Sequence, residues 1–207
     1  MALVNSIAIG TGRKKVGEIV LATLQGRTVA RKYQPNVRNP KTAAQIKQRT
    51  KMANIVMIWS IVSNFMKGAF VNRSRYHSAY NAFVRANIQY MDDSLMSYPW
   101  TFAENNVELY IKGGALGNIK LDALPGGDFD VTYKNISSSL KVGDKLRVLV
   151  GHIATRELKV IDCEFDQTDI DTGNSTVSPC FTGSCFAIAY IVTADGKKST
   201  NCEFIYS

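Results

Sequence analysis

No stretch of this 207-residue sequence is apolar enough to cross a membrane, which takes about 20 consecutive apolar residues in a helix. The N-terminus also lacks the charged segment that precedes the apolar core of a secretory signal. Both absences argue against insertion into a membrane or export through one. We therefore expect the chain to mature in a reducing compartment, where cysteines remain thiols.

Motifs for catalysis are lacking as well. The chain has two histidines, His77 and His152, and neither stands beside a serine or cysteine nucleophile motif. The acid-rich stretch 162–171 lacks the glutamate that closes a calcium loop, so we expect a solvated, acidic strand edge there. These absences predict a protein without enzymatic activity and without a cofactor.

The cysteines do not predict a metal site, because none has the Cys-x₂-Cys spacing of a zinc ligand pair. We expect free thiols. Cys180 and Cys185 flank a predicted turn and are the pair that could join in an oxidising environment. The other two cysteines are Cys163 and Cys202.

Acids are almost missing from the first 90 residues. This half holds 15 Lys and Arg residues and one acid, Glu18, which gives a net charge of +14. Residues 91–207 hold 10 Lys and Arg residues and 16 acids, a net charge of −6. Such asymmetry indicates binding to nucleic acid, to an acidic partner, or to the opposite end of another copy. The alternative is that the basic residues only keep a helical region soluble.

The basic half begins with a predicted β-hairpin over residues 15–33. Two β-prone runs, KVGEIVLATL and GRTVARKY, are separated by Gln25-Gly26, and Gly26 can adopt the positive φ of a tight turn. The segment before it, GTGRKKVG, lacks the Gly-Lys-Ser/Thr order of a phosphate-binding loop. We interpret that segment as a basic arm.

A long helix is predicted over residues 39–70. Asn39-Pro40 marks the entry, Thr42 and Gln45 have capping-box spacing, and Gly68 is a plausible end. The second half of this helix carries an apolar stripe at helical spacing: Ile55, Ile58, Trp59, Val62, Phe65, Met66 and Ala69. A second helix is predicted over residues 72–90, and its Tyr76, Tyr80 and Phe83 are expected to pack against Trp59.

The pattern changes from helical to alternating after residue 106. Residues 91–106 are interpreted as a linker, since Pro99 interrupts regular structure there. Seven short alternating runs follow within residues 107–207, separated by glycine-rich turns, which is typical of an immunoglobulin-like antiparallel sandwich. The predicted fold class is α+β. An N-terminal β-hairpin and two-helix region (1–90) precede the linker and a C-terminal antiparallel immunoglobulin-like β-sandwich.

Two segments carry a resemblance to known proteins. NPKTAAQIKQR at residues 39–49 is similar to an Asn-Pro-Arg/Lys-Thr-x-x-Gln-x-x-x-Arg signature that follows a basic, glycine-rich hairpin. FAIAYIVTADGKKSTNCEFIY at residues 186–206 resembles the closing strand pair of the same proteins. They form an uncharacterised family, a domain of unknown function, from Bacteroidota and their phages and mobile elements. The resemblance implies a structural or surface-binding role in a phage virion, and no catalytic residues.

Two functions from different classes follow. The first is a structural protein of a tailed-phage virion, in a collar or tail ring, whose copies meet head to tail and also contact neighbouring virion proteins. The second is nucleic-acid binding through the basic half, although no recognised nucleic-acid-binding motif is present. A carbohydrate-binding sandwich using Trp100 or Tyr110 is a third possibility. The residues expected to bind an acidic partner or phosphates are Arg13, Lys14, Lys15, Arg31, Lys32, Arg38, Lys41, Lys47, Arg49 and Lys51.

Overall fold

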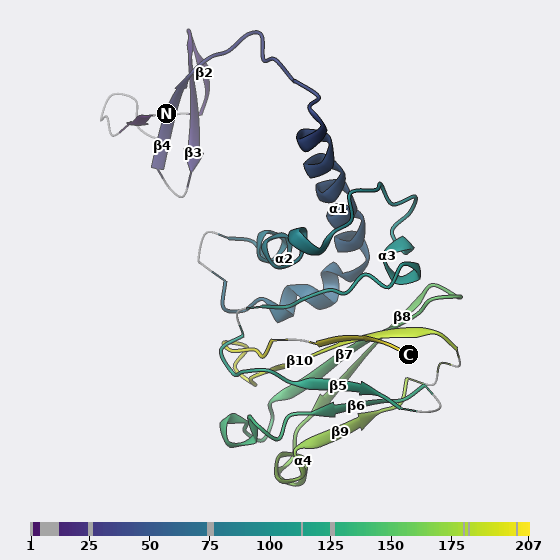
Figure 1. Cartoon of the computed structure of the whole chain (residues 1–207). Coiled ribbons are helices and arrows are strands. Elements are labelled where there is room, and N and C mark those ends of the chain that lie inside the picture. Colours follow the sequence, from purple (N-terminus) through teal and green to yellow (C-terminus); the bar gives the residue numbers. More distant parts are fainter. Residues whose placement is uncertain are drawn as a thin grey trace. The chain divides into compact units, whose positions relative to one another are not determined.

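The computed structural model describes residues 2–4, 13–24, 27–73, 77–112, 114–124, 127–179, 181, 183–201 and 203–207. Its contacts divide the chain into two compact units, Met1–Thr42 and Ala43–Ser207, which we call the N-terminal unit and the main unit. Figure 1 shows the elements of both. The architecture is α+β, as predicted, with an antiparallel sheet in the N-terminal unit and helices and two further antiparallel sheets in the main unit.

The N-terminal unit is one antiparallel sheet in the order β1-β4-β3-β2. The predicted hairpin is confirmed, because β3 and β4 pair along their whole length, from Ile19 with Lys32 to Leu24 with Arg27. The predicted turn residues Gln25 and Gly26 lie outside the described residues. The strands are β1 (Ala2–Val4), β2 (Lys14–Val16), β3 (Ile19–Leu24) and β4 (Arg27–Lys32).

The predicted long helix is α1 (Ala43–Ala69), and its buried face matches the predicted stripe closely. Gly68 is not the terminator that the sequence suggested, since it lies inside the helix, one residue before the end. The second helix, α2 (Ala79–Asn87), is shorter than predicted and begins where the Ser78 hydroxyl accepts a hydrogen bond from the Asn81 amide. Two short helices follow: η1 (Ile88–Tyr90) and α3 (Thr101–Glu104).

Helix α2 packs on α1 through the predicted aromatic contacts. The Trp59 ring lies 5.1 Å from the Phe83 ring and 5.8 Å from the Tyr80 ring, between ring centroids. Aromatic pairs at these separations stabilise a contact beyond the area that they bury. Tyr76, the third residue expected here, lies outside the described residues.

The rest of the main unit holds two antiparallel sheets, with strand orders β11-β10-β7-β8 and β5-β6-β9. The first contains β7 (Lys145–His152), β8 (Glu157–Glu164), β10 (Cys185–Val192) and β11 (Glu203–Tyr206). The second contains β5 (Lys120–Ala123), β6 (Phe129–Thr132) and β9 (Asn174–Val177). Short helices η2 (Ser137–Ser139) and α4 (Gln167–Thr172) lie in the connections.

The sequence was wrong about one strand and missed another. The first predicted strand was VELYIKG at residues 107–113, of which 107–112 are described and form no strand. The side-chain amide of Asn87 bonds both backbone groups of Tyr110 there, in place of a sheet neighbour. Strand β9 was missed because its sequence, NSTV, is polar and buries one side chain, that of Val177, which pairs with Phe129 of β6.

Strand β10 is buried on both faces, and this defines the layers of the main unit. Phe186, Ile188 and Tyr190 face the helices and share a core with the apolar stripe of α1. The alternate residues Ala187, Ala189 and Ile191 face the second sheet and share a core with it. Helices, first sheet and second sheet are therefore stacked in that order (Figure 1).

Residues 91–106, interpreted as a linker, contribute to the helix-side core through Met91, Met96, Phe102 and Ala103. Asn54 of α1 is fully buried and holds this segment: its Nδ2 donates to the carbonyls of Asp92 (3.3 Å) and Ser94 (2.7 Å), and its Oδ1 accepts from the Met96 amide (3.0 Å). The boundary between the compact units lies at residues 42 and 43. Separable folding of the parts before and after residues 91–106 stays a prediction.

We expect Asn54→Ala to lower the free energy of unfolding by about 1–3 kcal/mol, because it leaves buried backbone groups without partners. Denaturant unfolding measures this, and limited proteolysis should show faster cleavage within residues 92–96. The matched control is Asn64→Ala, since Asn64 is exposed on the same helix. Equal stability of the two variants would contradict the assignment.

We expect Gly68→Ala to destabilise the protein, although alanine normally favours a helix interior by about 1 kcal/mol over glycine. The added Cβ would lie 2.7 Å from the Tyr190 hydroxyl and 3.1 Å from Arg147 Nη1. That hydroxyl is held by its hydrogen bond to the Phe65 carbonyl. Thermal unfolding in a Tyr190→Phe background should show a smaller cost. A stabilising Gly68→Ala would contradict the packing described.

Candidate functional site

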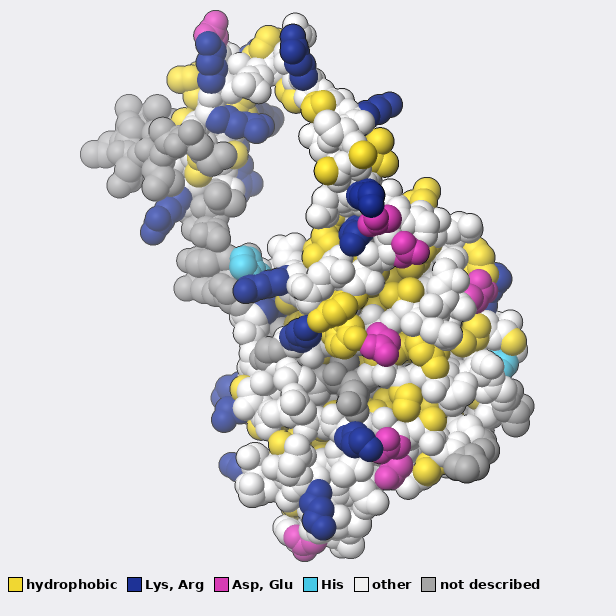
Figure 2. Space-filling model, in the orientation of Figure 1, with side chains coloured by type: hydrophobic (Ala, Val, Ile, Leu, Met, Phe, Trp, Pro, Cys, Tyr) yellow, Lys and Arg dark blue, Asp and Glu magenta, His cyan; other side chains and the backbone are white. Residues whose placement is uncertain are grey.

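The ten basic residues singled out from the sequence are divided between the two units. Seven of them, from Arg13 to Lys41, belong to the N-terminal unit, and Lys47, Arg49 and Lys51 belong to α1 of the main unit. All are exposed except Lys51, which is half-buried. In Figure 2, Lys and Arg side chains dominate the N-terminal unit, whereas acids stand beside them at the start of α1.

At the start of α1, Asp93 forms ion pairs with two of these lysines. The Lys47 amine lies 2.6 Å and the Lys51 amine 3.6 Å from carboxylate oxygens of Asp93. The hydrogen bond to Lys47 lowers the pKa of Asp93, and the same bond raises the pKa of Lys47. These pairs are exposed and contribute little stability. They do reduce the positive charge that this end of α1 presents to a partner.

The strand register of the N-terminal unit sorts its side chains onto two faces. Val16, Ile19 and Lys32 lie directly across from one another, so they share a face. Leu21 lies on the same face, and Lys14 lies directly across from it. Lys15, Val20 and Arg31 share the opposite face. There the Lys15 amine lies 3.7 Å from the centroid of the Tyr33 ring, a cation–π contact. Both faces therefore mix apolar and basic side chains, since Val20 and Val29 lie on the second face. We call the first face, which carries Val16 and Ile19, the apolar face, and the second, which carries Lys15 and Arg31, the basic face.

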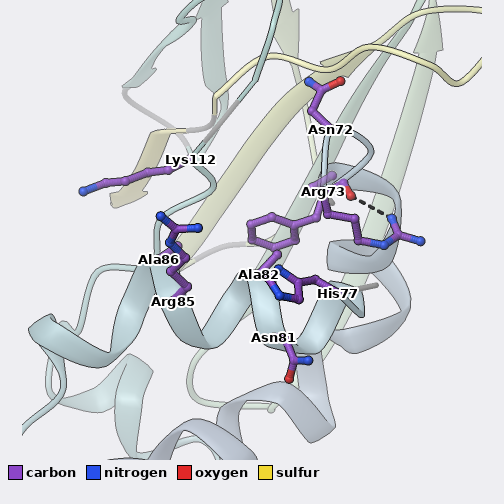
Figure 3. A pocket seen from close by; sticks show the side chains of 10 residues that line it. Asn72, Arg73, His77, Asn81, Ala82, Arg85, Ala86 and Lys112 are labelled. Carbon is purple, nitrogen blue, oxygen red and sulfur yellow. Dashed lines mark hydrogen bonds between the residues drawn. The ribbon is translucent and has the colours of Figure 1, made fainter. Parts of the chain in front are cut away.

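A second basic site is a pocket of about 600 Å³ between the end of α1 and α2, which we call the α1–α2 pocket. Its apolar lining comes from Ala69, Phe70, Ala82 and Ala86. Its polar lining is Asn72, Arg73, His77, Asn81, Arg85 and Lys112, with no acid among the lining residues described. In Figure 3, Arg73, His77 and Arg85 stand on different sides of the hollow.

Two of these side chains have partners within the chain. Arg73 Nη1 donates to the Phe70 carbonyl (2.7 Å), drawn as the dashed line in Figure 3. The Lys112 amine donates to the Tyr90 hydroxyl (2.8 Å), which lowers the pKa of Tyr90. The sequence shows Arg73 and Arg85 as basic surface. The sequence does not indicate that Lys112 lies near Arg73 and Arg85. Lys112 is distant from them in the chain, and only the folded structure brings it to the same pocket.

The acid-rich stretch forms a strand edge and a helix start, in agreement with its interpretation. Asp162 pairs with Arg147 across β7 and β8 at 2.8 Å, and Glu164 pairs with Lys145 at 2.5 Å. Asp166 and Asp169 form the capping box of α4, because the carboxylate of each accepts a hydrogen bond from the backbone amide of the other. These carboxylates have structural roles in the chain.

The remaining candidates have ordinary surroundings. Cys163 and Cys185 are free thiols, and burial raises the pKa of both. Cys180 and Cys202 lie outside the described residues, so the pairing considered for Cys180 and Cys185 does as well. His152 Nδ1 lies 2.7 Å from the Thr155 hydroxyl, and its ring stacks on Phe181.

Among the residues described, no three His, Cys, Asp or Glu side chains are grouped so as to hold a metal ion. Within the same ranges, no helix has the length and apolar character needed to span a membrane. What the geometry offers is recognition of anionic groups, at the basic face of the N-terminal unit and in the α1–α2 pocket.

These features describe an α+β protein with a basic N-terminal sheet and a helix-covered pair of antiparallel sheets. The chain belongs to the family of unknown function DUF6266, whose sequence model matches residues 10–205. The resemblance seen in the sequence is thus confirmed at the level of an uncharacterised family. No curated protein and no solved structure matches the chain.

We expect weak, sequence-independent binding to DNA that disappears by about physiological salt, because exposed cations alone are screened there. Fluorescence anisotropy with duplex and single-stranded oligonucleotides, between about 50 and 200 mM salt, measures this. Lys14→Ser with Lys15→Ser should weaken binding only as much as the matched control, Lys141→Ser with Lys198→Ser in the main unit. Tight, salt-resistant binding lost in the first variant alone would favour a dedicated nucleic-acid surface.

Proposed function

We propose that this protein is a non-enzymatic structural protein of a tailed-phage virion, and that its copies assemble through the N-terminal unit into a collar or tail ring. One observation carries the proposal. The sheet of the N-terminal unit has no second layer among the residues that the structure describes in it. Such a sheet needs a partner surface.

Several of the apolar side chains described in this unit are uncovered. Leu21 and Val29 are buried, whereas Val16 and Ile19 are 64% and 50% exposed. A sheet of a few short strands is marginally stable in water unless another layer covers one face. Burial of Val16 and Ile19 against a neighbouring subunit would supply this layer, at roughly 25 cal/mol for each Å² of apolar surface removed from water.

The charge of the unit indicates what kind of neighbour it meets. The N-terminal unit holds eight Lys and Arg residues and one acid, so it carries +7 of the chain's net +8, and the main unit carries +1. An acidic protein surface would complement the positive charge and would also cover the exposed apolar face. Nucleic acid satisfies the charge alone, since phosphate contacts need only accessible cations.

Further parts of the proposal concern the fold and its context. We infer that the two sheets of the main unit form an immunoglobulin-like sandwich, which the shared core of their seven antiparallel strands supports. The phage and Bacteroidota context is supported by the signature at residues 39–49. A head-to-tail contact that closes by rotation yields a ring.

The proposal predicts concentration-dependent self-association through the apolar face of the N-terminal unit. Val16→Thr with Ile19→Thr keeps β-propensity and removes apolar surface, so self-association should weaken about tenfold. The matched control is Val56→Thr with Val142→Thr, which changes two exposed valines of the main unit. Sedimentation velocity measures all three proteins. A wild-type chain that stays monomeric at every concentration would contradict the proposal.

A further inference from the structure

The α1–α2 pocket concentrates positive charge in a unit that is otherwise nearly neutral. The main unit holds 17 Lys and Arg residues and 16 acids. Six of its other basic side chains form ion pairs with acids, among them Lys47 with Asp93 and Arg147 with Asp162. The pocket instead collects Arg73, His77, Arg85 and Lys112, and no described acid lines it.

The layout of the pocket indicates a ligand with more than one anionic group. Arg73, His77 and Arg85 stand on different sides of the hollow in Figure 3 and do not surround a single point. A volume of about 600 Å³ is in the range of ligand pockets, and it is far larger than a single carboxylate or phosphate needs. The apolar lining suits the carbon atoms of a peptide that carries spaced acids.

The same main unit carries such a segment at α4. Asp166, Asp169 and Asp171 lie within six residues, and among the described ion pairs none joins them to a basic side chain. Asp166 and Asp171 are exposed, and the five helical steps from the N-cap Asp166 to Asp171 correspond to about 7.5 Å along the axis. Burial, reinforced by Asp169, Asp130 and Asp166, raises the pKa of the neighbouring Tyr133 to about 12, in keeping with a negative surface.

The two surfaces lie at opposite ends of the main unit. Figure 1 shows α2, which forms a wall of the pocket, in the helix layer, and α4 far from it, where Ile170 joins the core between the two sheets. The pocket and α4 of one copy therefore lie on opposite sides of the first sheet. A contact between them joins two copies, and because it uses different surfaces on each copy it is head to tail.

We propose that the α1–α2 pocket of one copy receives the acidic segment 166–171 of a second copy. This inference rests on the proposed function and adds a second contact between subunits, distinct from the apolar face of the N-terminal unit. Arg85 is the central basic residue, since it is exposed in the last turn of α2 and its guanidinium faces the hollow. Asp171, exposed in the last turn of α4, is its counterpart.

The test uses the full-length chain and charge reversal on each side. Arg85→Glu and Asp171→Arg should each weaken self-association about tenfold or more, because each places like charges at the contact. An equimolar mixture of the two variants should associate again. In that mixture the intact pocket of one variant meets the intact acidic segment of the other. Lys198→Glu is the matched control, with the same change of charge at an exposed residue outside the pocket, and it should behave as wild type.

Sedimentation velocity distinguishes failure of the pocket contact from failure of the proposed function. If Arg85→Glu associates as well as Lys198→Glu, or if the mixture does not recover, the pocket contact is wrong, while the effect of Val16→Thr with Ile19→Thr still tests the proposed function. A monomeric wild type overturns both. If Arg85→Glu self-associates normally but loses binding to a single-stranded oligonucleotide, the pocket is a nucleic-acid site and the inference is overturned.

Discussion

Burial of strand β10 on both of its faces is the constraint on which the main unit depends. Its odd and even residues serve different cores, one shared with α1 and one with the second sheet. Polar contacts then tie the end of α1 to the same region: the Tyr190 hydroxyl donates to the Phe65 carbonyl, and the Ser199 hydroxyl donates to the carbonyl of Ala69, the last residue of the helix. Helix, strands and the segment between them thus share one packed interior, in which cavities and unpaired polar groups are costly.

The N-terminal unit is the opposite case, because its sheet has strands and register but its described side chains form little interior. The two apolar side chains described there as buried lie on different faces, Leu21 on one and Val29 on the other, so the described residues form no core on either face. It also carries nearly all of the net charge of the chain. A main unit with a packed interior and a charged, poorly covered sheet are together what an assembling subunit needs. The first supplies fixed surfaces, and the second gains stability when a neighbour covers it.

Periodicity allowed much of the fold to be predicted. The apolar stripe of α1, the hairpin of β3 and β4, and most strands of the main unit follow from spacing alone. The hydrogen bonds of the buried side-chain amides could not be predicted in this way, because their partners are distant in sequence. Asn54 bonds the backbone of residues 38 to 42 positions away, and Asn87 bonds Tyr110. The same limit applies to the α1–α2 pocket, which unites Arg85 with Lys112. The ten basic residues predicted to bind an acidic partner or phosphates are close in sequence, and the structure distributes them over two units.

Hydrogen exchange at two protein concentrations tests the central claim, that a neighbouring copy completes the N-terminal unit, most directly. The account predicts that amides of β3 and β4 exchange slowly in concentrated protein and fast after dilution, because dilution removes the covering subunit. Amides of β7 and β10 should exchange equally slowly at both concentrations, since their core lies within one chain. Equal, strong protection of β3 and β4 in a dilute monomer would contradict the account, because the sheet would then be stable without a neighbour.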